Sequence, residues 1–148
     1  MSYILLVEQT APETPSTGQV LLYPKTDGIL YSKDDLGTER PVAGIPQLSK
    51  SVAYTTVLAD ANTHILHPTA DNNPRTFTID SNANVPYPIG TTLVFINQIN
   101  TVTIAITSDT LTLLGAGTTG SRIIAANGAL VALKIETTGW VCAGPGVT

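Results

Sequence analysis

From about residue 63 to the end of the chain, short β-prone runs alternate with turn signals at spacings of about 8–12 residues. The turns are rich in Gly, Asn and Pro, as in TADNNP and SNANVPYPIG, and no segment has a sustained helical period. The pattern therefore predicts an all-β fold, with an antiparallel β-sandwich or jelly-roll-like domain over 61–148. The expected strands are Thr63–His67, Arg75–Ile79, Thr91–Asn97, Val102–Thr107, Leu111–Leu114, Arg122–Ala125, Ala129–Glu136 and Trp140–Ala143.

The first 43 residues differ from the rest, because half of all charged residues lie in the first 40 positions. The runs QVLLYPK and ILYSK flank Asp27-Gly28, which predicts a β-hairpin with a type I′ turn. Both faces of this hairpin carry apolar side chains, and a two-stranded hairpin is not stable alone in water. We therefore expect an N-terminal β-hairpin arm over 1–43 that lies on another surface. Residues 44–60 form a joint, with room for a short helix around Pro46–Lys50.

Composition excludes several classes of protein. Only 12% of the 148 residues are charged, against about 25% in an average soluble protein, which predicts a surface partly covered by other chains. The net charge is −4 and the seven Lys and Arg residues do not cluster, so we expect no nucleic-acid partner. The start MSYILLVEQ is not a secretory signal, and no apolar run has the length of a membrane helix. The expectation is a protein made in the cytoplasm, with no membrane partner.

A glycine-rich stretch, LTLLGAGTTGSRIIAANG, matches a dinucleotide fingerprint in spacing. Gly115, Gly117 and Gly120 fit G-x-G-x-x-G, and Glu136 lies where a ribose-binding acid would be. That fingerprint requires a helix after the third glycine and a further parallel strand. Here an N-G turn interrupts the run, and only 28 residues follow Gly120. The prediction is a glycine-rich hairpin loop and no nucleotide cofactor.

Two polar groups resemble metal sites at first sight. His64 and His67 are three residues apart, so in a strand they point to opposite faces and cannot chelate one ion together. A threefold axis could still gather three copies of either ring, and this alternative stays open. Asp71, Asn72 and Asn73 offer oxygen ligands, but a calcium loop needs more carboxylates. We expect a tight turn closed by Asx side chains, and no metal.

No catalytic arrangement is recognisable. The single cysteine, Cys142, excludes a disulfide framework and is expected to be a buried structural thiol. The acids beyond position 40 lie mostly next to turns, with no carboxylate pair of the kind that cleaves glycans, so we expect no enzyme. They are Asp60, Asp71, Asp80, Asp109 and Glu136. Five aromatic side chains would suit a sugar-stacking platform, although core or interface positions are commoner. They are Tyr54, Phe77, Tyr87, Phe95 and Trp140.

Two stretches resemble virion proteins of tailed bacteriophages. The segment APETPSTGQVLLYPKTDGILYSKDDLGTE resembles one found in tail fibres and related appendages. The segment from HPTADNNPRTFTIDSNANVPYPIGTTLVFINQ through VTIAITSDTLTLLGAGTTGSRIIAANGALVALKIETTGWVCAG is similar to a β domain of phage fibres and capsid decoration proteins. Its recurring features are P-I-G-T, V-T-I-A-I, G-x-G-T-T-G-S-R, A-A-N-G and a closing G-W-x-x-x-G. The resemblance covers most of the chain apart from the joint.

The resemblance implies a non-enzymatic structural protein located in the virion, usually a homotrimer. Because the chain has no fibre shaft and no coiled-coil heptads, a capsid decoration or head-fibre-like protein is favoured. The implied partners are further copies of the chain and the major capsid protein or another virion protein. The alternative is a short tail-fibre or tail-tip protein that binds a host receptor or surface glycan. The arm is the expected docking or trimer interface, through Tyr3, Ile4, Leu5, Leu6, Leu21, Leu22, Tyr23, Ile29, Leu30 and Tyr31.

Overall fold

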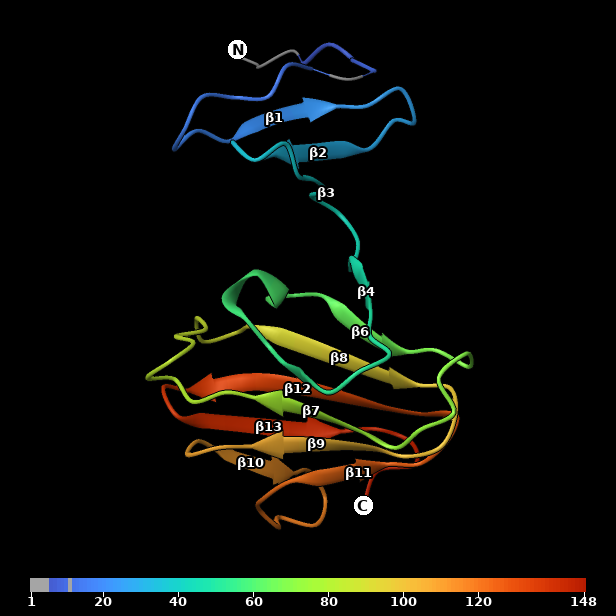
Figure 1. Cartoon of the computed structure of the whole chain (residues 1–148). Helices are drawn as coiled ribbons and strands as arrows, with labels where there is room; N and C mark the ends of the chain where they lie inside the picture. The colour runs from blue at the N-terminus through green and yellow to red at the C-terminus, as the bar shows by residue number, and fades with distance from the viewer. Residues whose placement is uncertain (1–5, 11) are drawn as a thin grey trace. The chain divides into compact units, whose positions relative to one another are not determined.

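The computed structural model of the protein describes residues 6–10 and 12–148. Within these residues the chain forms thirteen β-strands and one short 3₁₀ helix (Figure 1). The all-β prediction is therefore confirmed. The chain divides into two compact units after Pro46, and each unit has its own sheets.

The first unit is a three-stranded antiparallel sheet of β1 (Leu21–Pro24), β2 (Leu30–Lys33) and β3 (Glu39–Pro41). The hairpin between β1 and β2 is confirmed, but its turn is not type I′. Gly28 has φ 79° whereas Asp27 has no positive φ, and the Gly28 N–H donates to the Lys25 carbonyl at 2.9 Å. The Asp27 carboxylate accepts the Ile29 N–H at 2.9 Å, so a three-residue loop with a single left-handed glycine closes the hairpin. Sequence analysis did not predict β3.

The second unit contains two sheets. In the six-stranded sheet the order is β10-β13-β12-β8-β6-β4, and in the four-stranded sheet it is β11-β9-β7-β5. All eight predicted strands form, with ends within one residue of those expected, because period-2 alternation and turn residues mark them clearly. Their bounds are β6 (His64–His67), β7 (Arg75–Ile79), β8 (Thr92–Asn97), β9 (Val102–Ile106), β10 (Thr110–Leu113), β11 (Arg122–Ile124), β12 (Gly128–Glu136) and β13 (Gly139–Ala143).

The joint contributes elements that sequence analysis missed. Instead of a helix around 46–50, β4 (Gln47–Ser49) runs parallel to β6, with Leu48 opposite Ile65. Next come β5 (Tyr54–Thr55), parallel to β7, and the 3₁₀ helix η1 (Leu58–Asp60). Leu48 packs against the hydrophobic core, and this burial favours a strand where sequence alone allowed a helix.

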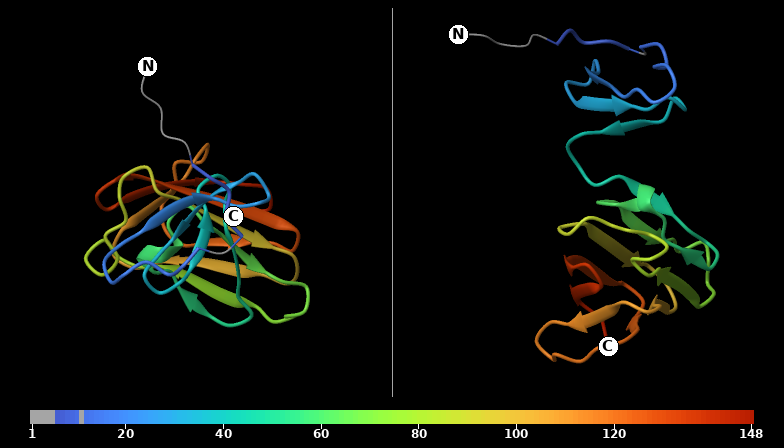
Figure 2. Two further views of the ribbon diagram at one scale, coloured as in Figure 1. Left: turned by 90° about the horizontal axis from the view of Figure 1, so that it is seen from above. Right: turned by 90° about the vertical axis from the view of Figure 1, so that its left-hand side faces the viewer.

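The expectation of an antiparallel sandwich or jelly roll is wrong in its strand pairing. After each of β4 to β9 the chain crosses to the other sheet, so that β4, β6 and β8 run parallel in one sheet and β5, β7 and β9 in the other (Figure 2). These successive coils are solenoid-like. Among the strands of the second unit, antiparallel pairs form where β11 joins β9 and where β12 joins β8 and β13, and β10 runs parallel to β13. Alternation along a strand specifies its faces but not its neighbours.

The two sheets of the second unit enclose one hydrophobic core. Phe77 of β7 stacks on Phe95 of β8 across the space between the sheets, with ring centroids 6.4 Å apart. Trp140 of β13 meets Tyr87 edge-on at 5.6 Å. None of these four rings is more than 3% exposed. Polar side chains also occupy core-facing positions, at the ends of the strands, and they form the clusters described next.

Candidate functional site

Five of the residues predicted to dock lie on the small sheet of the first unit: Leu21, Leu22, Tyr23, Leu30 and Tyr31. Ile29 lies in the connection before β2, Leu6 precedes the sheet in the chain, and Tyr3, Ile4 and Leu5 lie outside the described residues. Leu6 is 46% exposed, Leu22 53% and Ile29 40%. Leu21, Leu30 and Tyr31 are half-buried. Tyr23 is 2% exposed and its ring lies 6.1 Å from that of Tyr31, so it stabilises the unit itself. Of the predicted residues, only Leu6, Leu22 and Ile29 therefore offer exposed apolar surface to a partner. The structure adds further exposed apolar side chains, among them Val20, Leu36 and Val42.

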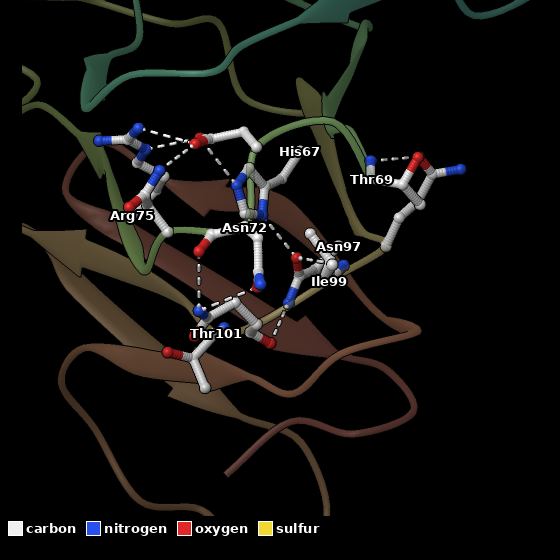
Figure 3. A network of polar contacts seen from close by, with 11 residues as sticks. His67, Thr69, Asn72, Arg75, Asn97, Ile99 and Thr101 are labelled. Atoms are coloured by element: carbon white, nitrogen blue, oxygen red, sulfur yellow. Dashed lines mark hydrogen bonds and ion pairs between the residues drawn. The ribbon is translucent and has the colours of Figure 1, made fainter.

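The most extensive polar cluster of the second unit joins β6, β7 and β8 and the loop after β6 (Figure 3). His67 is fully buried, with its Nδ1 2.7 Å from Asn97 Oδ1 and its Nε2 3.1 Å from Asp71 Oδ2. Arg75 donates to both oxygens of Asp71, at 2.6 and 2.8 Å. Asn73 donates to the same carboxylate at 2.7 Å. This is the Asx-closed turn predicted for TADNNP, now anchored by an arginine fork.

Asn97 fixes the other side of this cluster. Its amide nitrogen donates to the carbonyl oxygens of Asn100, Ile124 and Ala125 at 3.0–3.1 Å. The amide oxygen therefore faces His67 and also lies 3.3 Å from the Ile99 N–H. One side chain thus ties the end of β8 to the turn after it and to the end of β11.

The cluster joins strands and loops through hydrogen bonds between buried polar groups. Both ring nitrogens of His67 lie within hydrogen-bond distance of an oxygen atom, one of Asn97 and one of Asp71. The ring is fully buried inside the second unit, so it does not face an axis between copies of the chain. His64 points to the opposite face of β6, as predicted, and lies 3.0 Å from Gln47 Oε1. Among the described residues, no three His, Cys, Asp or Glu side chains gather as a metal site.

The acid stability of the protein should depend on Asp71. Arg75 first, and then Asn73 and His67, hold the pKa of this carboxyl well below its usual range. A depressed pKa stabilises the folded state above the unfolded-chain value of about 4, and that contribution is lost as the pH falls below about 4. Urea unfolding measured from pH 7 down to about 2 should show a smaller loss of stability in Asp71→Asn and Arg75→Met than in the natural chain. Parallel curves for all three proteins would contradict this assignment.

A second cluster surrounds Lys134, which lies on the inward face of β12. Its side chain is 1% exposed, its Nζ lies 2.6 Å from Asn82 Oδ1, and it sits 5.4 Å from the centre of the Trp140 ring. Asp109 accepts the Asn82 N–H with both carboxylate oxygens at 3.1 Å. Burial lowers the pKa of the Lys134 ammonium, and the charge of Asp109 offsets part of this effect. The cluster fastens the loop before β8 to the sheet.

Replacing Lys134 by methionine should leave the protein as stable at pH 7 or more so, because the stem stays packed and a buried charge is removed. A lowered lysine pKa means that the unfolded chain binds more protons, so the stability of the natural chain rises as the pH approaches about 10. Lys134→Met should lack this rise in urea unfolding at pH 7 and at about 10. Tyr87, whose pKa burial raises to about 12, acts alike in both proteins.

The matched variant is Asn82→Ala, which leaves the buried ammonium without its oxygen partner and should be clearly destabilising. A loss of more than about 2 kcal/mol in Lys134→Met would contradict the account of this cluster.

The glycine-rich motif and Cys142, the next two candidates, both occupy positions that serve the fold. Gly115, Gly117 and Gly120 all have positive φ and form the loop between β10 and β11, which a bridge between Thr112 and Thr119 closes as a hairpin. A strand follows the loop, where a dinucleotide site would need a helix. Cys142 is fully buried, as predicted, and burial raises the pKa of its thiol.

The acids and aromatic rings are dispersed among separate structural contacts. Asp60 accepts from Tyr54 and from the Val57 N–H, at 2.8 Å each. Asp80 accepts the Ser81 N–H at 2.7 Å, and Glu136 is exposed at the end of β12. The core encloses four of the five aromatic rings considered for sugar stacking, while Tyr54 is half-buried under Lys50. These rings therefore form no exposed platform.

Comparisons with protein-family models and with curated proteins found no match to this chain. Within the described part of the chain, no helix has both the length and the apolar character to cross a membrane.

Proposed function

We propose that the chain is a non-enzymatic structural protein of a tailed-phage virion: a homotrimer that decorates the capsid or forms a head-fibre-like appendage. The observation that carries this proposal is the surface of the first unit. Among its described residues, Tyr23 is the one hydrophobic side chain that is buried, whereas Leu22 of β1 and Ile29, just before β2, are exposed. So small a sheet with exposed apolar side chains needs a covering partner.

The polar clusters of the second unit are consistent with this role. Their side chains form hydrogen bonds with neighbouring strands and loops, through His67, Asp71, Asn97 and Lys134. Hydrogen bonds between strands and loops stabilise the fold, as expected for a structural protein. The resemblance to virion segments spans the sheet of the first unit and most strands of the second, which supports the same assignment.

The partner of the first unit is the major capsid protein or another virion protein. The test uses the purified full-length chain and particles from a phage mutant that lacks it, with binding measured by cosedimentation. The natural chain should bind, and Leu22→Asp and Ile29→Asp should each weaken binding at least tenfold. Thr76→Asp, an exposed change on the second unit, is the matched control and should bind normally. Equal binding by all variants, or none by the natural chain, would overturn the docking role.

The second candidate is a short tail-fibre or tail-tip protein that binds a host receptor or surface glycan. The exposed polar loops TADNNP and GAGTTG favour it, since both connect strands at the ends of the sheets. Binding of the labelled chain to host cells, together with absence of particle binding, would support this candidate over the decoration role.

A further inference from the structure

The outward faces of the two sheets in the second unit differ in chemistry. On the four-stranded sheet the outward side chains are mostly threonine, as at Thr76, Thr78 and Thr103. On the six-stranded sheet they are mostly aliphatic, and Glu136, at the end of β12 opposite Gly139, is the one Asp, Glu, Lys or Arg on that face. We call its central part the apolar face, defined by Leu66, Val94, Ile96, Val131, Leu133 and Val141.

Strand register makes the apolar face continuous. Leu66 of β6 lies opposite Ile96 of β8, Val94 of β8 opposite Val131 of β12, and Leu133 of β12 opposite Val141 of β13. Outward residues in register on neighbouring strands are about 5 Å apart and touch one another. Val131 and Leu133 are nonetheless 43% and 38% exposed. Within the second unit, no other segment covers the apolar face at these two residues.

The sheet is large enough to matter for assembly. The apolar face spans four strands that are spaced by about 4.8 Å, with about five residues each, which gives roughly 19 by 16 Å, or on the order of 300 Å². Exposed apolar patches of this size on single chains are often interaction sites. A stable interface buries about 800 Å² per partner, so the apolar face supplies about 40% of one side. Exposed Ile89 and Leu114 lie just beyond strands of the same sheet.

A second copy of this chain is the occupant that fits the charge pattern. The protein has net charge −4, so two copies can pack closely only through a region that brings no like charges together. The apolar face is such a region, and it contains no charged group that would require a complementary partner. The threonine-rich face, in contrast, has the composition of a surface left in water.

We propose that the apolar face of the six-stranded sheet is the contact between copies of the chain in its oligomer. This inference rests on the self-association in the proposed function, but it places the contact on the second unit, whereas sequence analysis placed it on the arm. The first unit is then free to bind another virion protein.

The test is the native mass of the full-length chain, by native mass spectrometry and by light scattering over a range of concentrations. The natural chain should be a trimer, and the double variant Val131→Lys/Leu133→Lys should be a monomer with an unchanged far-UV circular dichroism spectrum. The matched control Thr76→Lys/Thr103→Lys places the same charges on the other sheet and should remain a trimer.

A second pair of variants keeps the inference falsifiable if the lysine variant fails to fold. Val131→Thr/Leu133→Thr preserves strand propensity and should raise the subunit dissociation constant at least tenfold. A natural trimer that both double variants leave intact would overturn the apolar-face contact while the proposed function stands. A natural chain that is monomeric at all concentrations would overturn both the contact and the homotrimer.

Discussion

Replacing Asn97 by leucine is expected to lower the free energy of unfolding by about 4 kcal/mol. The side chain is 1% exposed and donates to three backbone carbonyls, while its oxygen faces His67. Leucine has a similar volume but makes none of these bonds. The Ala125 carbonyl keeps the Gly128 N–H, whereas each buried group that is left without a partner costs about 1–3 kcal/mol. Urea unfolding at pH 7, followed by the fluorescence of Trp140, the single tryptophan, measures the change.

The control for this prediction is Gln98→Leu, the adjacent position just beyond β8. Gln98 is exposed, and its side chain accepts one N–H, from Thr69, at 3.1 Å. Its replacement should cost less than about 1 kcal/mol. If Asn97→Leu proved no more destabilising than Gln98→Leu, the amide would not be the tie that the geometry indicates.

Gly144→Ala is expected to be similarly damaging, at about 3 kcal/mol, for a reason of space. A Cβ atom at this position would lie 1.9 Å from the carbonyl oxygen of Ala129. That oxygen belongs to the backbone of β12, which the Ala129 N–H also ties to the Pro145 carbonyl at 3.0 Å. The chain cannot relieve the clash by turning a side chain, so one of the two backbone segments must move.

Gly139→Ala, at the first residue of β13, separates this effect from a general cost of replacing glycine. Its Cβ would lie 3.1 Å from the Cβ of Glu136 and 3.2 Å from Oε2. The exposed carboxylate can turn away, and the contact with Cβ requires only a small shift, far less than the overlap at Gly144. Thermal unfolding should show a small shift for Gly139→Ala and a large one for Gly144→Ala. Equal shifts would contradict the close approach at Gly144.

Gly139 and Gly144 show which features could be predicted from the sequence alone. The closing G-W-x-x-x-G was recognisable as a motif, and the structure supplies a physical reason for its last glycine. Period-2 alternation also located the strands and placed His64 and His67 on opposite faces, as the structure confirms. Local signals sufficed for these conclusions because each depends only on residues within one strand or turn.

Strand order and the polar clusters depend on contacts between distant residues. The connections over residues 68–74 and 80–91 are longer than two-residue hairpin loops, so they do not force the chain back into the same sheet. The resulting parallel coils bring Asn97 to His67, thirty positions earlier in the chain. Similarly, Lys134 reads in the sequence as a polar break in the apolar run ALVALKIE, and its buried contact with Asn82 arises only from folding.

Each of the two units has its own exposed apolar surface. From its apolar residues, sequence analysis predicted that the arm is a docking or a trimer interface. The structure leaves Leu22 and Ile29 exposed there, but it also gives the second unit an uncharged aliphatic face. Two separate apolar surfaces suit a protein that binds its own copies through one and a different protein through the other.

The measurement that most directly tests the proposed virion role is quantitative mass spectrometry of purified, washed virions of the phage that encodes this chain. The account predicts that the chain is present in a fixed ratio to the major capsid protein, with a copy number per particle that is a multiple of three. A chain abundant in the infected-cell lysate but absent from washed virions would contradict it.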